Sequence, residues 1–294
     1  MDGYIRLPSM CWKFQPGLRT WLLLGVVILS GCMTPLPKLN ANQECLHEDF
    51  ENRISAAGQC LVLDIYKSPK ANNEPLLVVF VHGDSLRNRG YRYIQLYQRA
   101  IKDASSRNLI FVALTRPGYQ NGRETSTGRH HYHTGDAFRP YIVKSVVTAI
   151  LRLANHYNAK KVAVIGHSGG GVILTGGLGT EPDFQPDLAV IIASVFDLSA
   201  WVAHHGFSRS QWPTEKSISP HKFTANVSPA VEVVAISGSA DTNAISKFSA
   251  DYVDLMKRDG KNARHVDLDG ASHNGILQDE RLWTMLNDML RKLE

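Results

Sequence analysis

The sequence predicts an α/β fold in which a mostly parallel β-sheet is covered by helices on both faces. Short aliphatic runs alternate with amphipathic stretches along the chain after residue 60. Most of these runs lack the apolar–polar alternation of a half-exposed strand, so we expect strands buried on both sides. With 294 residues, 44% of them hydrophobic, the chain can also form one large core.

The predicted strands are apolar segments bounded by turn residues. In chain order they are 61–66, 76–81, 109–114, 161–165, 188–194, 231–237 and 265–268. Helical spacing of apolar residues predicts helices between them, at 91–104, 138–157, 244–258 and 279–293. A further helix is expected from Val172, and Gly176, Gly177 and Gly179 predict that it ends early.

Residues 196–228 interrupt this alternation. The segment contains tryptophans, adjacent histidines and prolines but few aliphatic residues, and it is too long for a plain connection. We expect a small insertion over one end of the sheet. Its aromatic residues either line a substrate pocket or form the insertion's own core: Trp201, His204, His205, Phe207 and Trp212.

The N-terminal segment predicts export. Residues 21–30, WLLLGVVILS, form an apolar run that is short for a permanent membrane helix but typical of a signal peptide. The run ends in Leu-Ser-Gly-Cys, which resembles a bacterial lipobox with Cys32 as the lipidated residue. An uncleaved anchor with a chance cysteine is the alternative, and Met10 rather than Met1 is a possible start.

These features divide the chain into three parts. Residues 1–31 are the predicted lipoprotein signal peptide, 32–43 a tether, and 44–294 the folded domain. The residue after Cys32 is Met33 rather than Asp, and the resemblance to sorted lipoproteins implies the outer membrane, if the cell has one, with the domain facing the periplasm. In that oxidising compartment Cys45 and Cys60 are expected to form a disulfide rather than two buried free thiols.

Composition argues against some other functions. The net charge is only +5, and no lysine- or arginine-rich run is present, so we expect no nucleic-acid partner. His130, His131 and His133 could suggest a metal site, but no carboxylate or cysteine joins them at ligand spacing. They are expected to form a polar loop at the rim of the site, without metal.

A candidate nucleophile follows the predicted strand 161–165. The stretch Gly166-His167-Ser168-Gly169-Gly170 fits the G-x-S-x-G pattern between a strand and a helix. Glycines two residues before and after the serine remove side chains that would collide in such a tight turn. The turn would expose Ser168 and aim the backbone N–H of Gly169 at a developing oxyanion.

A serine nucleophile needs a base and an orienting acid, and both should follow later strands of the sheet. Asp241 follows the predicted strand 231–237, and His273 follows 265–268. We therefore expect His273 as the base and Asp241 as the acid. Asp197, after the strand 188–194, is the rival acid. Asp267 and Asp269 are weaker rivals because they lie so close to His273 in sequence.

Together, the run 76–83, Arg116-Pro117-Gly118-Tyr119, GHSGG, GSADT and GASHNG resemble the α/β-hydrolase superfamily over residues 61–294. A looser resemblance links the chain to dienelactone hydrolase and the catalytic domains of prolyl oligopeptidases. The resemblance implies eight strands, the second antiparallel, and no cofactor. It also implies that the backbone N–H of Asp84, or of Gly83, is the second oxyanion donor. The Asp84 carboxylate would oppose an oxyanion if it turned inward.

The expected function is therefore that of a serine hydrolase. A small carboxylic ester is favoured as the substrate, and a peptidase or amidase acting on small peptides is the runner-up. A binding lipoprotein without turnover is a third possibility, against which the complete set of serine, histidine and aspartate argues.

Overall fold

The computed structural model describes residues 44–85, 104–129, 138–208 and 214–294, all of which belong to one structural unit, Leu39–Glu294. Several sequence predictions lie outside the described residues: Cys32 with its leader and tether, almost all of the helix 91–104, the histidines His130, His131 and His133, and Trp212.

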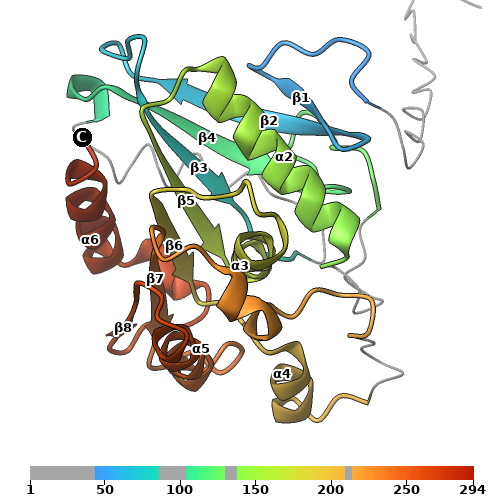
Figure 1. Cartoon of the computed structure of the whole chain (residues 1–294), viewed down its shortest axis with the longest axis vertical. Helices are drawn as coiled ribbons and strands as arrows, with labels where there is room; N and C mark the ends of the chain where they lie inside the picture. The colour runs from blue at the N-terminus through green and yellow to red at the C-terminus, as the bar shows by residue number, and fades with distance from the viewer. Residues whose placement is uncertain (1–43, 86–103, 130–137, 209–213) are drawn as a thin grey trace, which may run out of the picture. The chain divides into compact units, whose positions relative to one another are not determined.

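An eight-stranded sheet forms the centre of the fold (Figure 1). Its spatial order is β1-β2-β4-β3-β5-β6-β7-β8, with β2 antiparallel to both β1 and β4 and all other pairs parallel. The strands are β1 (Arg53–Ala56), β2 (Gln59–Lys67), β3 (Leu76–Val81), β4 (Leu109–Thr115), β5 (Lys161–His167), β6 (Leu188–Ile192), β7 (Glu232–Gly238) and β8 (Ala263–Leu268). The predicted fold class is confirmed.

The central strands are apolar throughout because helices cover both faces of the sheet. In β3, Leu77 and Val79 belong to the core cluster that contains the buried residues of α2, α3 and α5, whereas Val78 and Phe80 belong to the cluster of α6. The helices are α2 (Pro140–His156), α3 (Gly169–Thr180), α4 (Leu198–His204), α5 (Ser246–Arg258) and α6 (Glu280–Arg291), with short 3-10 helices η1 (Ala104–Ser106), η3 (Pro220–Asn226) and η4 (Gly275–Gln278). Among the described helices, none has the length and apolar character needed to cross a bilayer.

The prediction that α3 ends early was wrong. The helix continues to Thr180, and its glycines permit close packing instead of terminating it. A Cβ at Gly176 would lie 2.9 Å from Ile218 Cγ2, and one at Gly177 would lie 2.5 Å from Val147 Cγ2. Tertiary packing therefore outweighs the low helix propensity of glycine here.

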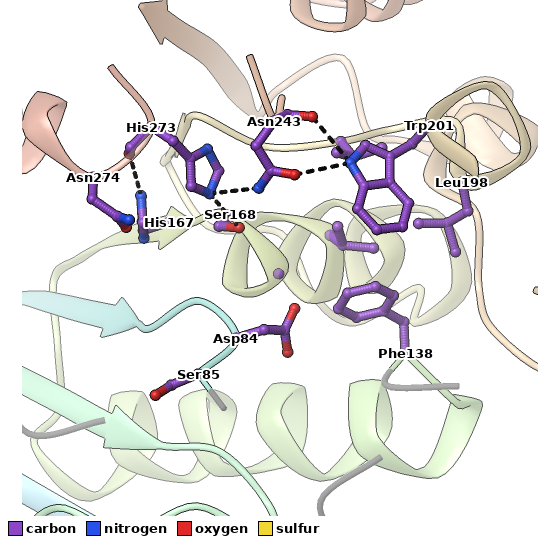
Figure 2. Close-up of a pocket in the computed structure, with 13 residues that line it drawn as sticks. Asp84, Ser85, Phe138, His167, Ser168, Leu198, Trp201, Asn243, His273 and Asn274 are labelled. Carbon is purple, nitrogen blue, oxygen red and sulfur yellow. Dashed lines mark hydrogen bonds between the residues drawn. The ribbon is translucent and has the colours of Figure 1, made fainter. Parts of the chain in front are cut away.

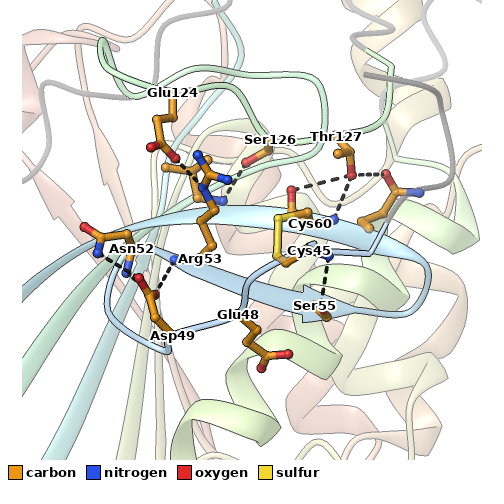
Figure 3. Close-up of a disulfide and its surroundings, with 12 residues drawn as sticks. Cys45, Glu48, Asp49, Asn52, Arg53, Ser55, Cys60, Glu124, Ser126 and Thr127 are labelled. Atoms are coloured by element: carbon orange, nitrogen blue, oxygen red, sulfur yellow. Dashed lines mark hydrogen bonds and ion pairs between the residues drawn. A yellow bond between two sulfur atoms is a disulfide. The ribbon is translucent and has the colours of Figure 1, made fainter. Parts of the chain in front are cut away.

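The N-terminal edge of the domain is joined to the sheet by a disulfide (Figure 3). Cys45 and Cys60 are bonded, with an S–S distance of 2.07 Å. The Cys45 N–H donates to Ser55 Oγ at 3.0 Å, and the Cys60 N–H donates to Thr127 Oγ1 at 2.7 Å. The bond closes a loop around β1, the edge strand that the sequence analysis did not predict.

Candidate active site

Ser168 lies in a tight turn between β5 and α3. Its backbone has φ +51° and ψ −122°, a left-handed conformation that is strained for a residue with a side chain. The flanking glycines are required by space: a Cβ at Gly170 would collide with the Val81 carbonyl oxygen, and one at Gly166 would lie 2.7 Å from the Gly171 nitrogen. The serine is thereby held at the carboxyl end of the sheet, at the start of α3.

His273 and Asp241 converge on this serine from the loops after β8 and β7. His273 Nε2 lies 3.0 Å from Ser168 Oγ, and its Nδ1 lies 2.7 Å from Asp241 Oδ2 (Figure 2 shows the serine and histidine). Asp241 is only 4% exposed, and its Oδ1 accepts the backbone N–H groups of Asn243 and Ala244 at 2.8 and 2.9 Å. These bonds orient the carboxylate toward the imidazole.

The other candidate acids have different partners. Asp197 caps α4 by accepting the N–H groups of Ser199 and Ala200, and it faces His221 at 3.6 Å. Asp267 accepts a hydrogen bond from Ser237, and Asp269 accepts one from Ser239. The described contacts thus direct Asp241, and none of its rivals, to His273 Nδ1.

Two buried histidines support the loops of the site. His167 Nε2 donates to the His273 carbonyl oxygen at 3.1 Å. His82 Nδ1 donates to the Gly83 carbonyl oxygen at 2.8 Å, and its Nε2 accepts the Arg116 N–H at 3.1 Å. Burial lowers the pKa of His167 to about 4 and the pKa of His82 to about 3, so both are neutral near pH 7.

The predicted oxyanion donors lie beside the nucleophile. A Cβ at Gly83 would lie 2.9 Å from Ser168 Cβ, so the backbone of the loop after β3 passes directly against the serine. Gly169 and Asp84 both line the cavity next to Ser168. Their backbone N–H groups, with that of Gly83, remain the candidate donors.

The Asp84 side chain also lines the cavity. Its Oδ1 lies 3.0 Å from Arg116 Nη2 and accepts a hydrogen bond from the Tyr119 hydroxyl at 2.8 Å. Its Oδ2 is so close to Gly169 that a Cβ there would collide with it, so the carboxylate lies beside the serine turn, the arrangement that would oppose an oxyanion.

The cavity over Ser168 has a volume of about 340 Å³ and a wall that is about half polar and half apolar. Two residues of the insertion contribute to it, Leu198 and Trp201. The other described aromatic residues of the insertion contact one another and α5: His204 lies against Phe248, and Phe207 against His205. Because His204 and Phe207 are exposed, they do not form a core of the insertion. No described group of three potential ligand side chains could hold a metal ion.

Asn243 is a site residue that the sequence analysis missed. Its Nδ2 donates to His273 Nε2 at 3.1 Å, and its backbone carbonyl oxygen accepts the indole N–H of Trp201 at 3.0 Å (Figure 2). Because a neutral imidazole nitrogen has one lone pair, Asn243 and Ser168 compete for it. Asn243 follows Asp241 by two residues in the same turn, and this position in the sequence could have indicated that it lies near His273.

A family model described as the alpha/beta hydrolase family matches residues 78–282, which include all three converging residues. The chain belongs to the alpha/beta hydrolase family. A search of curated protein sequences finds no match.

Solved structures similar to this alpha/beta hydrolase include both esterases and peptidases. An esterase from Pyrococcus furiosus has a TM-score of 0.61 at 16% identity, covering 82% of this chain and 90% of its own. Esterase 2 from Thermogutta terrifontis, phosphonylated by sarin, has a TM-score of 0.56 at 15% identity, with coverages of 80% and 90%. The acylaminoacyl peptidase of Pyrococcus horikoshii has a TM-score of 0.61 at 14% identity, but this chain spans only 40% of that protein. At such identities the likeness establishes the fold.

Proposed function

We propose that the protein is a serine hydrolase that cleaves small carboxylic esters through an acyl-enzyme. The observation that carries this proposal is the chain of contacts from Ser168 Oγ to His273 Nε2 and from His273 Nδ1 to Asp241 Oδ2, at 3.0 and 2.7 Å. This is the geometry that a serine requires to lose its proton as it attacks an acyl carbon.

The proposed reaction has two halves. Ser168 Oγ attacks the carbonyl carbon while His273 takes its proton, and the tetrahedral oxyanion is bound by backbone N–H groups at Gly169 and at Asp84 or Gly83. His273 then donates the proton to the departing alcohol, leaving Ser168 acylated. Water, deprotonated by His273, attacks the acyl group and restores the serine. Asp241 holds His273 in the required tautomer.

A fluorophosphonate probe tests the enzyme class directly. The folded wild type is expected to be labelled, whereas Ser168→Ala is expected not to be. A folded wild type that resists labelling would support the binding-protein alternative. Turnover of nitrophenyl esters of graded chain length, compared with aminoacyl nitroanilides, then separates an esterase from a peptidase, since an ester hydrolase is expected to leave the anilides largely uncleaved.

We also infer an exported, lipid-anchored location from the leader and the lipobox-like Leu-Ser-Gly-Cys. In a bacterial host the full chain is expected to incorporate labelled fatty acid and to sediment with the envelope membranes. Cys32→Ala is expected to lose the label. Equal labelling of the wild type and the Cys32→Ala variant would contradict lipidation at Cys32.

A further inference from the structure

The proposed mechanism leaves one charged group in the pocket without a role. Asp84 is the one carboxylate among the described residues that line the cavity. About half of the wall around it is apolar, with Phe138, Val172 and Leu198 among its side chains. Because the other polar residues of the lining carry hydroxyl, amide or imidazole groups, this carboxylate is the group that can distinguish a cationic substrate from a neutral one.

The carboxylate is held in place through one of its two oxygens. Asp84 Oδ1 contacts Arg116 Nη2 at 3.0 Å and the Tyr119 hydroxyl at 2.8 Å. Arg116 is only 1% exposed, and its guanidinium lies 4.9 Å from the centre of the Tyr119 ring. Burial raises the pKa of Tyr119, so its hydroxyl remains a hydrogen-bond donor. Asp84 is thus fixed by a buried pair.

The second oxygen faces the reacting end of the pocket. Among the described residues, none donates a hydrogen bond to Asp84 Oδ2. This oxygen lies so close to Gly169 that a Cβ there would collide with it. Gly169 follows the nucleophile in the chain, and Figure 2 shows the Asp84 carboxylate directed into the space beside the Ser168 turn.

This placement has opposite consequences for two kinds of substrate. With a neutral acyl group, an anion beside the developing oxyanion destabilises the transition state. With a cation next to the scissile carbonyl, the same anion attracts the substrate and offsets that repulsion. A site that combines attraction for one class with repulsion of another discriminates more strongly than either effect alone.

We propose that Asp84 is a specificity-determining residue that accepts a hydrogen bond from a protonated amine beside the scissile carbonyl, so that the substrate class is an α-aminoacyl ester. The α-amino nitrogen is two bonds from the carbonyl carbon, which places it near Gly169 and Asp84 Oδ2 when the carbonyl meets Ser168. The apolar part of the wall, which includes Phe138, Val172 and Leu198, would receive the side chain. This inference rests on the proposed serine hydrolase activity.

The first test compares two nitrophenyl esters of equal shape: L-leucine nitrophenyl ester and the nitrophenyl ester of 4-methylpentanoic acid, which lacks the amine. We measure kcat/KM for both, corrected for spontaneous hydrolysis, and take their ratio in each protein. Asp84→Asn is expected to lower this ratio at least tenfold, whereas Tyr119→Phe, which keeps the charge, is expected to retain most of it. Comparing ratios between proteins cancels the intrinsic reactivity of the amino ester.

A second test uses the wild type alone, so it does not depend on the folding of a variant. The boronic acid analogue of leucine is expected to inhibit at least tenfold more tightly than the boronic acid without the amine. Equal inhibition would overturn the inference, as would an Asp84→Asn variant that accelerates both esters equally. Fluorophosphonate labelling distinguishes failure of this inference from failure of the proposed hydrolase activity. A wild type that is labelled but shows no preference for the amine contradicts only the amine inference, whereas an unlabelled wild type contradicts the hydrolase proposal as well.

Discussion

Asp241 and Asp197 each follow a strand at the same end of the sheet, and their hydrogen bonds separate their roles. Asp241 is buried and directed at His273, whereas Asp197 is committed to the first turn of α4 and to His221. Both aspartates are candidate acids because each follows a strand. The backbone N–H groups that each carboxylate accepts determine where it points.

Asp241→Asn is therefore expected to lower kcat for nitrophenyl esters by about four orders of magnitude, as loss of the orienting acid does in other triads. The amide would favour the wrong tautomer of His273. Asp197→Asn is the matched control and is expected to change kcat less than threefold. A large loss in the control with little loss in Asp241→Asn would transfer the role of the acid to Asp197.

The two buried histidines make stability depend on acidity. Burial holds the pKa of His167 at about 4 and that of His82 at about 3, below the ordinary value of 6.5. Their stabilisation is complete above pH 6.5, because neither the folded nor the unfolded chain then binds the protons. As the pH falls below 6.5, only the unfolded histidines become protonated, and stability is lost until the folded groups also titrate.

Each of these histidines is expected to lower the free energy of unfolding by up to about 1.4 kcal/mol per pH unit below pH 6.5. Urea unfolding of wild type and His82→Gln at pH 7, 6, 5 and 4.5 measures this. The variant is expected to be less stable at pH 7 but to show a shallower fall with acidity. Parallel curves would mean that His82 does not contribute to the pH dependence.

Among the elements, α3 combines catalytic and packing demands in one glycine-rich helix. The strained Ser168 immediately precedes its first turn, and its last turns lie against α2 and η3. Glycine serves two purposes in this helix. At Gly170 it allows the backbone at the end of β3 to pass close by, and at Gly177 and Gly179 it allows α2 and η3 to pack closely.

Gly179→Ala is expected to destabilise the protein by about 1–2 kcal/mol, because overpacking of this size outweighs a gain of about 1 kcal/mol in helix propensity. Its Cβ would meet the Cβ of Phe223 and lie 2.9 Å from the Phe223 carbonyl oxygen, neither of which can rotate away. Gly176→Ala would meet the Cγ2 of Ile218 and is expected to cost less. Denaturant unfolding compares the two, and a Gly179→Ala protein as stable as wild type would contradict the packing argument.

At the scale of the whole molecule, the disulfide connects the N-terminal edge to the sheet. Closing a loop between Cys45 and Cys60, 15 residues apart, is expected to contribute roughly 3 kcal/mol by restricting the unfolded chain. Reduction with dithiothreitol should lower the free energy of unfolding by that amount. The double variant Cys45→Ala, Cys60→Ala should already be less stable and should not respond to the reductant. A wild type insensitive to reductant would contradict this.

The sheet and the three converging residues could be predicted because their signals are local. Buried parallel strands require unbroken aliphatic runs, and the serine turn requires glycines at set positions. β1 was missed because the four residues Arg53–Ala56 are too few to show a period. The full length of α3 depends on packing against Ile218 and Phe223, which lie far from the helix in sequence. The position of the Asp84 carboxylate likewise depends on Arg116 and Tyr119, so no local sequence pattern predicts either feature.

Because Trp201 lines the pocket, ligand binding there is expected to change the intrinsic tryptophan fluorescence of the protein. The indole N–H of Trp201 bonds to Asn243, which in turn contacts His273, so a molecule that enters the cavity changes the surroundings of this fluorophore. Trp283, buried in α6 with its N–H bonded to the Leu277 carbonyl oxygen, lies outside the lining of that cavity, so its emission is expected to change less. Binding could thus be followed with Ser168→Ala protein, in which no product accumulates.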